Sequence, residues 1–347
     1  MKKILYINLK KNKRLKFFIG SSETTREAPF NKIRINTIRK NSINFNFDAY
    51  VSYSPLHIKN INYSFLEWFI GFAEGDGTFY SQKLKNDKMR LSFEIGQKDP
   101  KVLYLIKKVL GFGLIHSRQK KNTNQPYWVY RIQTKKNIQR LIHLLNGNLV
   151  LTKRRVQFNK WLKKAKKMNI VPFNLRTKNI SIYNGVQISL KTGWLSGFID
   201  AEGCFYATLS TPSTCSLLTP SIKQKMHITQ KKVYNEDELL QKIGVLFLST
   251  AQVKPLSSKK IRKQNNLLAS KSKQLESSFR IEISSLASHK CIMQYLSKFK
   301  LKTNKWISFC RWSRVVMARE KNYHLCEENL PKLLQLCKAI NMTNLIQ

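Results

Sequence analysis

Short stretches in which apolar and polar residues alternate recur along the chain. An alternation of this kind predicts a β-strand with one buried and one open face, because successive side chains of a strand point to opposite sides. The pattern is found over residues 89–95, 128–133 and 279–284. We therefore expect antiparallel sheets in which one face is covered and the other is polar and open.

Between these strands, apolar residues recur at the spacing of a helix. That period predicts amphipathic helices over residues 101–110, 153–168, 237–247 and 304–319. The run Ser64-Phe65-Leu66-Glu67 has the spacing of a capping box, in which a serine and a glutamate three residues later satisfy the first backbone amides of a helix. It predicts that an earlier helix starts at this point.

The chain contains the same unit twice. Residues 68–79 read WFIGFAEGDGTF, and residues 194–205 read WLSGFIDAEGCF. Three more pairs of segments follow in the same order at growing separations: IGQK with ITQK, YRIQ with FRIE, and FNKW with FCRW. Four matches in register indicate one duplicated fold, with extra loop length in the second copy. The period is too long for a solenoid.

In each copy the predicted order is helix, two strands, helix, two strands, helix. This is an αββαββα unit of the α+β class. We expect a basic, poorly ordered leader at 1–62, a first half at 63–175, a second half at 176–325 and a C-terminal helix or tail at 326–347.

Composition narrows the class of partner. Lys and Arg number 63 against 19 Asp and Glu, which leaves a formal net charge of +44. Hydrophobic residues make up 42% of the chain, enough for a core. No apolar run approaches the roughly 18 residues of a membrane span, so no such span is expected. The charge favours a nucleic acid as partner, with an anionic membrane surface as the weaker alternative.

Small residues recur at helical spacing within the repeated motif. Gly71 and Gly75 are four residues apart, as are Gly193, Gly197 and Ala201. Each set therefore lies on one helical face. Small residues at this spacing let two helices approach backbone to backbone, so we expect the two motif helices to pack against each other.

An acid precedes the glycine that ends each motif: Asp76 before Gly77, and Glu202 before Gly203. The helix dipole disfavours a carboxylate at a C-terminus by about 0.3–1 kcal/mol. Mg²⁺ binds one or two carboxylates together with waters and phosphate oxygens, and a pair of such ions can hydrolyse a phosphodiester. We expect the two acids to hold Mg²⁺. The alternative is tight helix packing with solvated ends.

The two copies resemble the two signature motifs of LAGLIDADG homing endonucleases in their single-chain, two-motif form. The resemblance covers residues 63–317, about three quarters of the chain. It implies a pseudo-twofold pair of αββαββα halves, with two antiparallel, saddle-shaped sheets whose helices lie on one face. It also implies a monomer that makes a Mg²⁺-dependent staggered break in double-stranded DNA at a long intron-insertion site.

The resemblance also assigns roles within the site. The acids would bind metal, the glutamines would help to order the attacking water, and the lysines would act in catalysis or merely contact phosphate. The catalytic positions that it implies are Asp76, Glu202, Gln97, Gln230, Lys153 and Lys302. Glu74 and Asp200, two residues before the metal-binding acids, are expected to be structural.

Base recognition would fall to polar residues on the open strand faces, since Arg pairs bidentately with guanine and Gln with adenine. For each residue, a solvated strand face or a phosphate contact is the alternative. The candidates are Gln82, Arg90, Ser92, Arg131 and Gln133 in the first half and Lys223, Lys225, His227 and Arg280 in the second.

Two other functions fit the basic charge. One is an RNA maturase that assists splicing of its host intron RNA, with or without residual DNA cleavage, and the other is a basic structural RNA-binding protein. Acids at both motif ends favour the nuclease, because an RNA binder gains nothing from clustered carboxylates. The abundance of Lys, Asn, Ile, Phe and Leu, together with family habit, favours the mitochondrion, with the chloroplast as the alternative.

Overall fold

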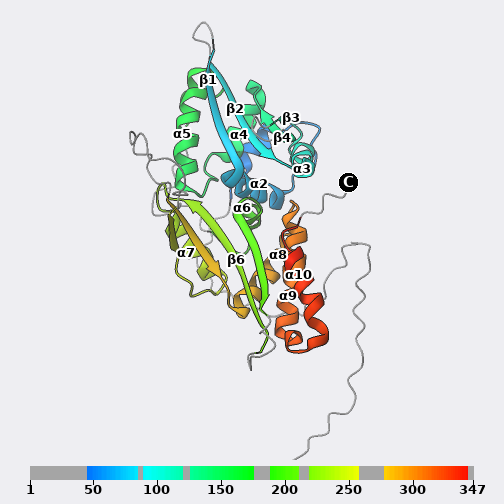
Figure 1. Cartoon of the computed structure of the whole chain (residues 1–347). Coiled ribbons are helices and arrows are strands. Elements are labelled where there is room, and N and C mark those ends of the chain that lie inside the picture. The colour runs from blue at the N-terminus through cyan, green and yellow to red at the C-terminus, as the bar shows by residue number, and fades with distance from the viewer. Residues whose placement is uncertain are drawn as a thin grey trace, which may run out of the picture. The chain divides into compact units, whose positions relative to one another are not determined.

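Two four-stranded antiparallel sheets, each with helices on one face, form the framework of the molecule (Figure 1). The computed structural model describes residues 45–84, 89–119, 126–175, 188–210, 219–257 and 277–342. The strand order is β1-β2-β4-β3 in one sheet and β5-β6-β8-β7 in the other, so the second sheet repeats the topology of the first.

The first half has a short helix before the motif helix, and two helices follow its sheet. Its elements are α1 (Asp48–Tyr53), α2 (Tyr63–Asp76), β1 (Gly77–Lys83), β2 (Met89–Gln97), α3 (Lys101–Leu110), β3 (Leu114–Gln119), β4 (Pro126–Ile132), α4 (Lys135–Leu145) and α5 (Thr152–Lys167).

The second half repeats this order from α6 onwards and adds a C-terminal helix. Its elements are α6 (Trp194–Glu202), β5 (Gly203–Ser210), β6 (Ser221–Lys231), α7 (Glu236–Leu246), β7 (Lys254–Ser257), β8 (Ser277–Ile283), α8 (Leu286–Lys298), α9 (Lys305–Glu320), η2 (Tyr323–Leu325), η3 (Glu327–Asn329) and α10 (Leu330–Ala339).

The duplicated α+β architecture is confirmed, and each half has a helix between its last strand and its predicted last helix that the pattern did not predict. Helix α3 has the predicted bounds, and α5, α7 and α9 begin and end within one residue of theirs. The additional helices α4 and α8 follow the last strand of each sheet. Helix α4 has 11 residues and α8 has 13, and the predicted last helix begins a few residues after each of them.

The start of α2 differs from the prediction. Asn62 is the N-cap, and its side chain accepts a hydrogen bond from the amide of Phe65 at 2.9 Å. The predicted capping box of Ser64 and Glu67 is therefore wrong. Glu67 instead accepts a hydrogen bond from the backbone amide of Gly193 in the other half, at 2.7 Å.

Residues 45–62 contradict the prediction of a poorly ordered leader over this range. Phe47 and Tyr50 are 4% and 1% exposed, and α1 packs against α4. Asn148 receives a hydrogen bond from the amide of Asn46 and donates one to its carbonyl oxygen. Apolar side chains such as Phe47 and Tyr50, which follow no period in the sequence, are therefore buried against the first half. The remainder of the predicted leader, residues 1–44, lies outside the described residues.

The C-terminal helix α10 packs on β5 and α9. Arg311 of α9 donates hydrogen bonds to the carbonyl oxygens of Ala339 and Met342, both at 2.7 Å. Within the described ranges, none of the helices combines the length and the apolar character needed to cross a bilayer.

The two halves meet through α2 and α6, which lie side by side at the centre of the molecule (Figure 1). A Cβ atom on Gly71 would overlap the carbonyl oxygen of Trp194, and one on Gly197 would overlap that of Trp68. The helices therefore touch backbone to backbone, as the spacing of small residues predicted. The two contacts are related by the repeat.

We expect Gly71→Ala and Gly197→Ala each to lower the free energy of unfolding by about 2 kcal/mol or more, the scale of overpacking a close contact. Helix propensity alone predicts the opposite, since Ala is favoured over Gly by about 1 kcal/mol. Chemical denaturation of the full chain measures the change.

Gly96→Ala is the matched control, because the nearest atom to a Cβ there would be Cδ2 of Tyr127 at 3.7 Å. A stability for Gly71→Ala or Gly197→Ala equal to that of the wild type would contradict the close approach.

Candidate active site and nucleic-acid interface

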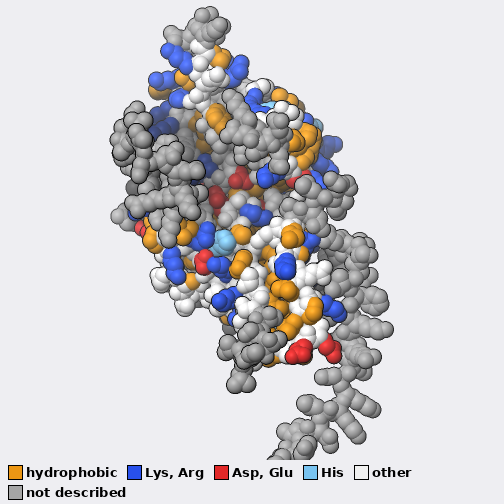
Figure 2. Space-filling view, in the orientation of Figure 1, with side chains coloured by type: hydrophobic (Ala, Val, Ile, Leu, Met, Phe, Trp, Pro, Cys, Tyr) orange, Lys and Arg blue, Asp and Glu red, His pale blue; other side chains and the backbone are white. Residues whose placement is uncertain are grey.

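Asp76 and Glu202 end the two motif helices and lie beside each other. The last turns of α2 and α6 are in contact, since a Cβ on Gly75 would lie 3.1 Å from Cγ of Glu202. In the space-filling view, acidic side chains gather near the middle of the face that carries both sheets, with Lys and Arg side chains around them (Figure 2). Helix packing thus brings together the two acids that the repeat singled out.

The surroundings of Asp76 oppose its negative charge. Burial and the nearby charge of Glu202 raise the pKa of Asp76 to about 6, although Lys305, Gln97 and Arg154 act in the opposite direction. The side-chain amide of Gln97 donates a hydrogen bond to Oδ2 of Asp76 at 2.6 Å. A carboxylate held in this way gains from a further positive charge beside it.

Two basic residues that the sequence analysis did not single out cap the C-termini of the motif helices. Arg154 donates hydrogen bonds to the carbonyl oxygens of Glu74 and Gly75, both at 2.6 Å. Lys305 donates to the carbonyl oxygen of Ala201 at 2.9 Å. Both side chains act electrostatically on Asp76 and Glu202, and burial lowers the pKa of each.

The signal for these two residues was present in the repeat. The separation that relates FNKW to FCRW also relates Arg154 to Lys305. Both therefore occupy the same place at the start of the last long helix, α5 or α9. The lysines that the resemblance implied, Lys153 and Lys302, lie one and three residues before these positions.

The predicted lysines have different environments. The ammonium group of Lys302 lies 5.5 Å from the ring centroid of Trp68 and 5.8 Å from that of Phe65. It is therefore Lys305 that faces the acids, and Lys302 packs on aromatic rings. Lys153 donates a hydrogen bond to the side-chain oxygen of Gln230 and is acted on by the charge of Glu202.

The two predicted glutamines are not equivalent. Gln97 contacts Asp76, as described, whereas Gln230 is buried and accepts from Lys153 while its amide donates to the carbonyl oxygen of Thr229 at 3.1 Å. No hydrogen bond joins Gln230 to Glu202 within the described residues. The two carboxylates thus have different immediate partners.

Glu74 and Asp200 hold the halves together. Glu74 accepts hydrogen bonds from the amides of Val150 and Leu151 and from the indole of Trp194 in the other half. Asp200 accepts from the amides of Lys302 and Thr303 and from the indole of Trp68. Each acid joins the start of a long helix to the opposite motif helix, which is a structural arrangement.

The acid pair offers oxygen ligands of the kind that a hard cation needs. The described residues contain no group of three or more His, Cys, Asp or Glu side chains that could hold a metal on their own. Mg²⁺ typically takes only one or two carboxylates and completes its shell with waters and substrate phosphate. Two adjacent, partly buried carboxylates fit such an ion.

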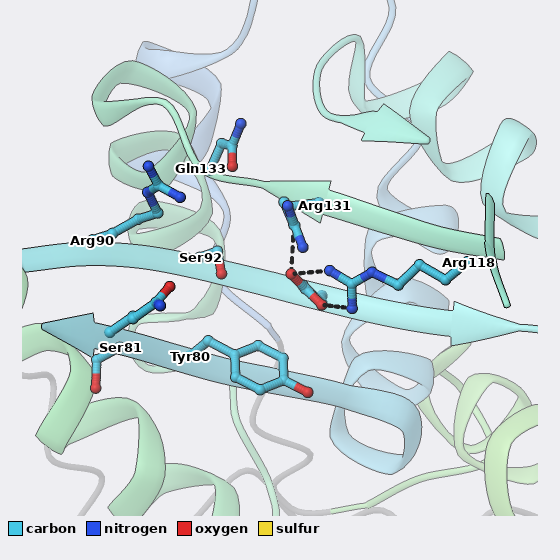
Figure 3. A pocket seen from close by; sticks show the side chains of 9 residues that line it. Tyr80, Ser81, Arg90, Ser92, Arg118, Arg131 and Gln133 are labelled. Atoms are coloured by element: carbon cyan, nitrogen blue, oxygen red, sulfur yellow. Dashed lines mark hydrogen bonds and ion pairs between the residues drawn. The ribbon is translucent and has the colours of Figure 1, made fainter. Parts of the chain in front are cut away.

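All five candidate base-reading residues of the first half lie on the open face of the first sheet. They line a hollow of about 410 Å³ together with four residues that the sequence analysis did not select: Tyr80, Ser81, Glu94 and Arg118 (Figure 3). Strand β2 does not alternate as predicted, because Ser92 and Glu94 are buried although they face this side. Arg118 and Arg131 cover Glu94 there.

The second sheet has a matching open face. Along β6, Lys223 is exposed, and Lys225 and His227 are half-buried, while the residues between them are buried. Lys225 forms an ion pair with Glu282 at 2.9 Å. Arg280 donates a hydrogen bond to Thr229 at 2.9 Å. Burial lowers the pKa of His227.

Known proteins resemble the chain in both halves. The family model for LAGLIDADG endonucleases matches residues 69–165 and 195–316. "Probable intron-encoded endonuclease 4" of Neurospora crassa is 32% identical over 80% of the chain and 44% of its own length. "Intron-encoded RNA maturase bI4" of Saccharomyces cerevisiae is 32% identical over 42% of the chain and 20% of its own length. The chain thus spans less than half the length of these relatives.

The fold agrees with a solved structure. The crystal structure of the I-LtrWI LAGLIDADG homing endonuclease, bound to its target DNA, matches 81% of the chain and 99% of its own length, with a TM-score of 0.59 and 19% identity. The arrangement of two motif helices between two sheets is therefore shared with that protein. The family model matches both halves of the chain, and the chain belongs to the LAGLIDADG endonuclease family.

Proposed function

We propose that the chain is a sequence-specific DNA endonuclease that makes a Mg²⁺-dependent staggered double-strand break at a long intron-insertion site. The observation that carries the proposal is the pair of carboxylates, Asp76 and Glu202, at helix C-termini between two basic open sheets. Neither helix stability nor binding to a polyanion favours acids at this place.

Asp76 and Glu202 would hold Mg²⁺, which supplies positive charge to the scissile phosphate and lowers the pKa of bound water. Gln97 donates to Asp76 and fixes the orientation of its carboxylate. Lys305 and Arg154 keep positive charge next to the acids, and we assign to them the role expected of Lys302. Lys153 and Gln230 form a second polar pair beside Glu202.

The open faces of the two sheets would follow the major groove of double-stranded DNA, one half-site each. The residues named above on the two faces supply side chains for base edges, while the surplus of Lys and Arg supplies phosphate contacts. Because one chain carries both halves, a monomer suffices.

An RNA maturase is the second candidate, since one relative carries that name. It would bind the host intron RNA with or without residual DNA cleavage. Several relatives are intron-encoded, among them one named for cox1, and we propose a mitochondrial location on this ground. If splicing of the host intron proceeds unchanged after the protein is deleted, the maturase role is excluded.

Asp76→Asn and Glu202→Gln should each reduce cleavage by at least about a hundredfold, the scale on which one group that stabilises transition-state charge acts. Binding should persist, because neither acid attracts DNA. Cleavage and gel-shift assays on DNA that joins the exons flanking the intron measure both.

Glu238→Gln serves as the control, since Glu238 is an exposed acid on α7. This variant should cleave the DNA as the wild type does. Wild-type protein that leaves this DNA uncut in Mg²⁺, while a known endonuclease cuts its own target in the same buffer, would refute the proposed activity.

A divalent cation should raise the melting temperature of the free protein at pH 8 but not at pH 5. The cation binds the ionised carboxylate, and the pKa of Asp76 is about 6. Asp76→Asn should remove most of the effect, which differential scanning fluorimetry with Mg²⁺ or EDTA can detect.

Without a cation, the contribution of Asp76 to folding stability falls as the pH rises, whereas the stabilisation by a cation grows with pH. Asp76 binds its proton more tightly in the folded chain, at about 6, than at its ordinary value of 3.8, so its contribution to stability declines as the pH rises through that window. Equal stabilisation of wild type and Asp76→Asn by Mg²⁺ at pH 8 would show that the ion binds elsewhere.

A further inference from the structure

A buried acid lies in the middle of the open face of the first sheet. The side chain of Glu94 is 10% exposed and forms ion pairs with Arg118 and Arg131, the two arginines labelled beside it in Figure 3. Arg131 is its register partner on β4, and Arg118 reaches it from β3. On a surface that would meet DNA, an acid opposes binding, so its retention there calls for a specific role.

The two arginines use different nitrogens. Arg118 donates from Nη1 to Oε2 of Glu94 at 3.1 Å and from Nη2 to Oε1 at 3.4 Å. Arg131 donates from Nε to Oε1 at 2.5 Å. Among the described residues, the two terminal nitrogens of Arg131 have no hydrogen-bond partner.

This pattern leaves one hydrogen-bonding edge free. Both oxygens of Glu94 accept from arginines and its side chain is 10% exposed, so the arginines are better placed than the acid to meet a base. The terminal nitrogens of Arg131 are the pair that fits O6 and N7 of guanine. A guanidinium held at Nε loses less freedom on binding than a free one, which favours recognition.

We propose that Arg131 reads one guanine of the first half-site and that Glu94, braced by Arg118, is the positioning residue that holds the guanidinium for this contact. The inference rests on the proposed function. It adds that the recognised base is a guanine and that Glu94 orients the arginine that contacts it.

The second sheet provides a natural comparison. Glu282 is 34% exposed, and its partners are Lys225 at 2.9 Å and Nη1 of Arg280 at 3.7 Å. Nε of Arg280 is bound to Thr229 instead. These side chains are half-buried, with the acid less covered than Glu94, and Arg280 is not held at Nε by the acid. Removal of the charge at Glu282 should therefore not affect the guanine of the first half-site.

The test uses the full chain with Asp76→Asn, so that bound DNA stays uncut. Affinity is measured for the joined-exon DNA and for every single-base substitution of it. We expect one base pair of the first half-site at which guanine is preferred by about tenfold or more. Arg131→Lys keeps the charge but lacks the pair of nitrogens that can donate bidentately to guanine, so it should abolish that preference.

Glu94→Gln should reduce the same preference by at least about fivefold and leave the other positions unchanged, because the amide keeps the shape but holds the guanidinium less firmly. Glu282→Gln is the control and should leave this base pair as in the wild type. Affinity for unrelated DNA should stay equal or rise in Glu94→Gln, since one negative charge is lost.

Different outcomes would overturn the proposed function and the inference about Arg131 and Glu94. A chain that binds all substituted duplexes equally overturns the proposed sequence-specific function itself. A chain that selects its target but keeps the full guanine preference in Arg131→Lys, or in folded Glu94→Gln, overturns only this inference. If Glu94→Gln does not fold, as judged by circular dichroism, Arg131→Lys decides alone.

Discussion

The backbone contact between α2 and α6 is the constraint on which the rest of the molecule depends. Gly71 and Gly197 leave no room for a side chain against the opposite helix, so the two C-termini must end side by side. Each sheet starts directly at its motif helix, at Gly77 or Gly203, so the same contact also sets where the two open faces begin. Any residue larger than glycine would separate the acids and the sheets together.

Four carboxylates lie in the last turns of these helices, and the fold treats them in two ways. Glu74 and Asp200 accept hydrogen bonds from amides at the starts of α5 and α9, where the helix dipole favours negative charge. Burial still raises the pKa of Glu74, to about 7. Asp76 and Glu202 have no such helix start, only Gln97 and the caps Arg154 and Lys305. Acids two residues apart thus differ in their partners: one accepts hydrogen bonds from backbone amides at a helix start, and the other has only side-chain partners near it.

Much of this could be predicted from the sequence, because a duplication carries its own internal comparison. The repeat located the motif helices, their close contact and the acid pair, since each depends on local spacing. What could not be predicted depends on contacts between distant segments. Phe47 and Tyr50 have no periodic pattern and become ordered only against α4. Glu94 is polar and yet buried, because arginines from two other strands cover it. Lys302 and Lys305 differ by three residues, and only the start of α9 determines which of them faces the acids.

Because the two halves belong to one chain, they can differ in sequence. In a symmetric dimer every residue of the interface occurs twice in the same surroundings. Here Arg154 in one half corresponds to Lys305 in the other, and Gln97 contacts an acid while Gln230 contacts Lys153. The repeat partner of Glu94 is His227, so this position carries a carboxylate on one open face and an imidazole on the other. Because the helix contact fixes the position of both sheets, the side chains of each open face can differ from those of the other, as Glu94 and His227 do.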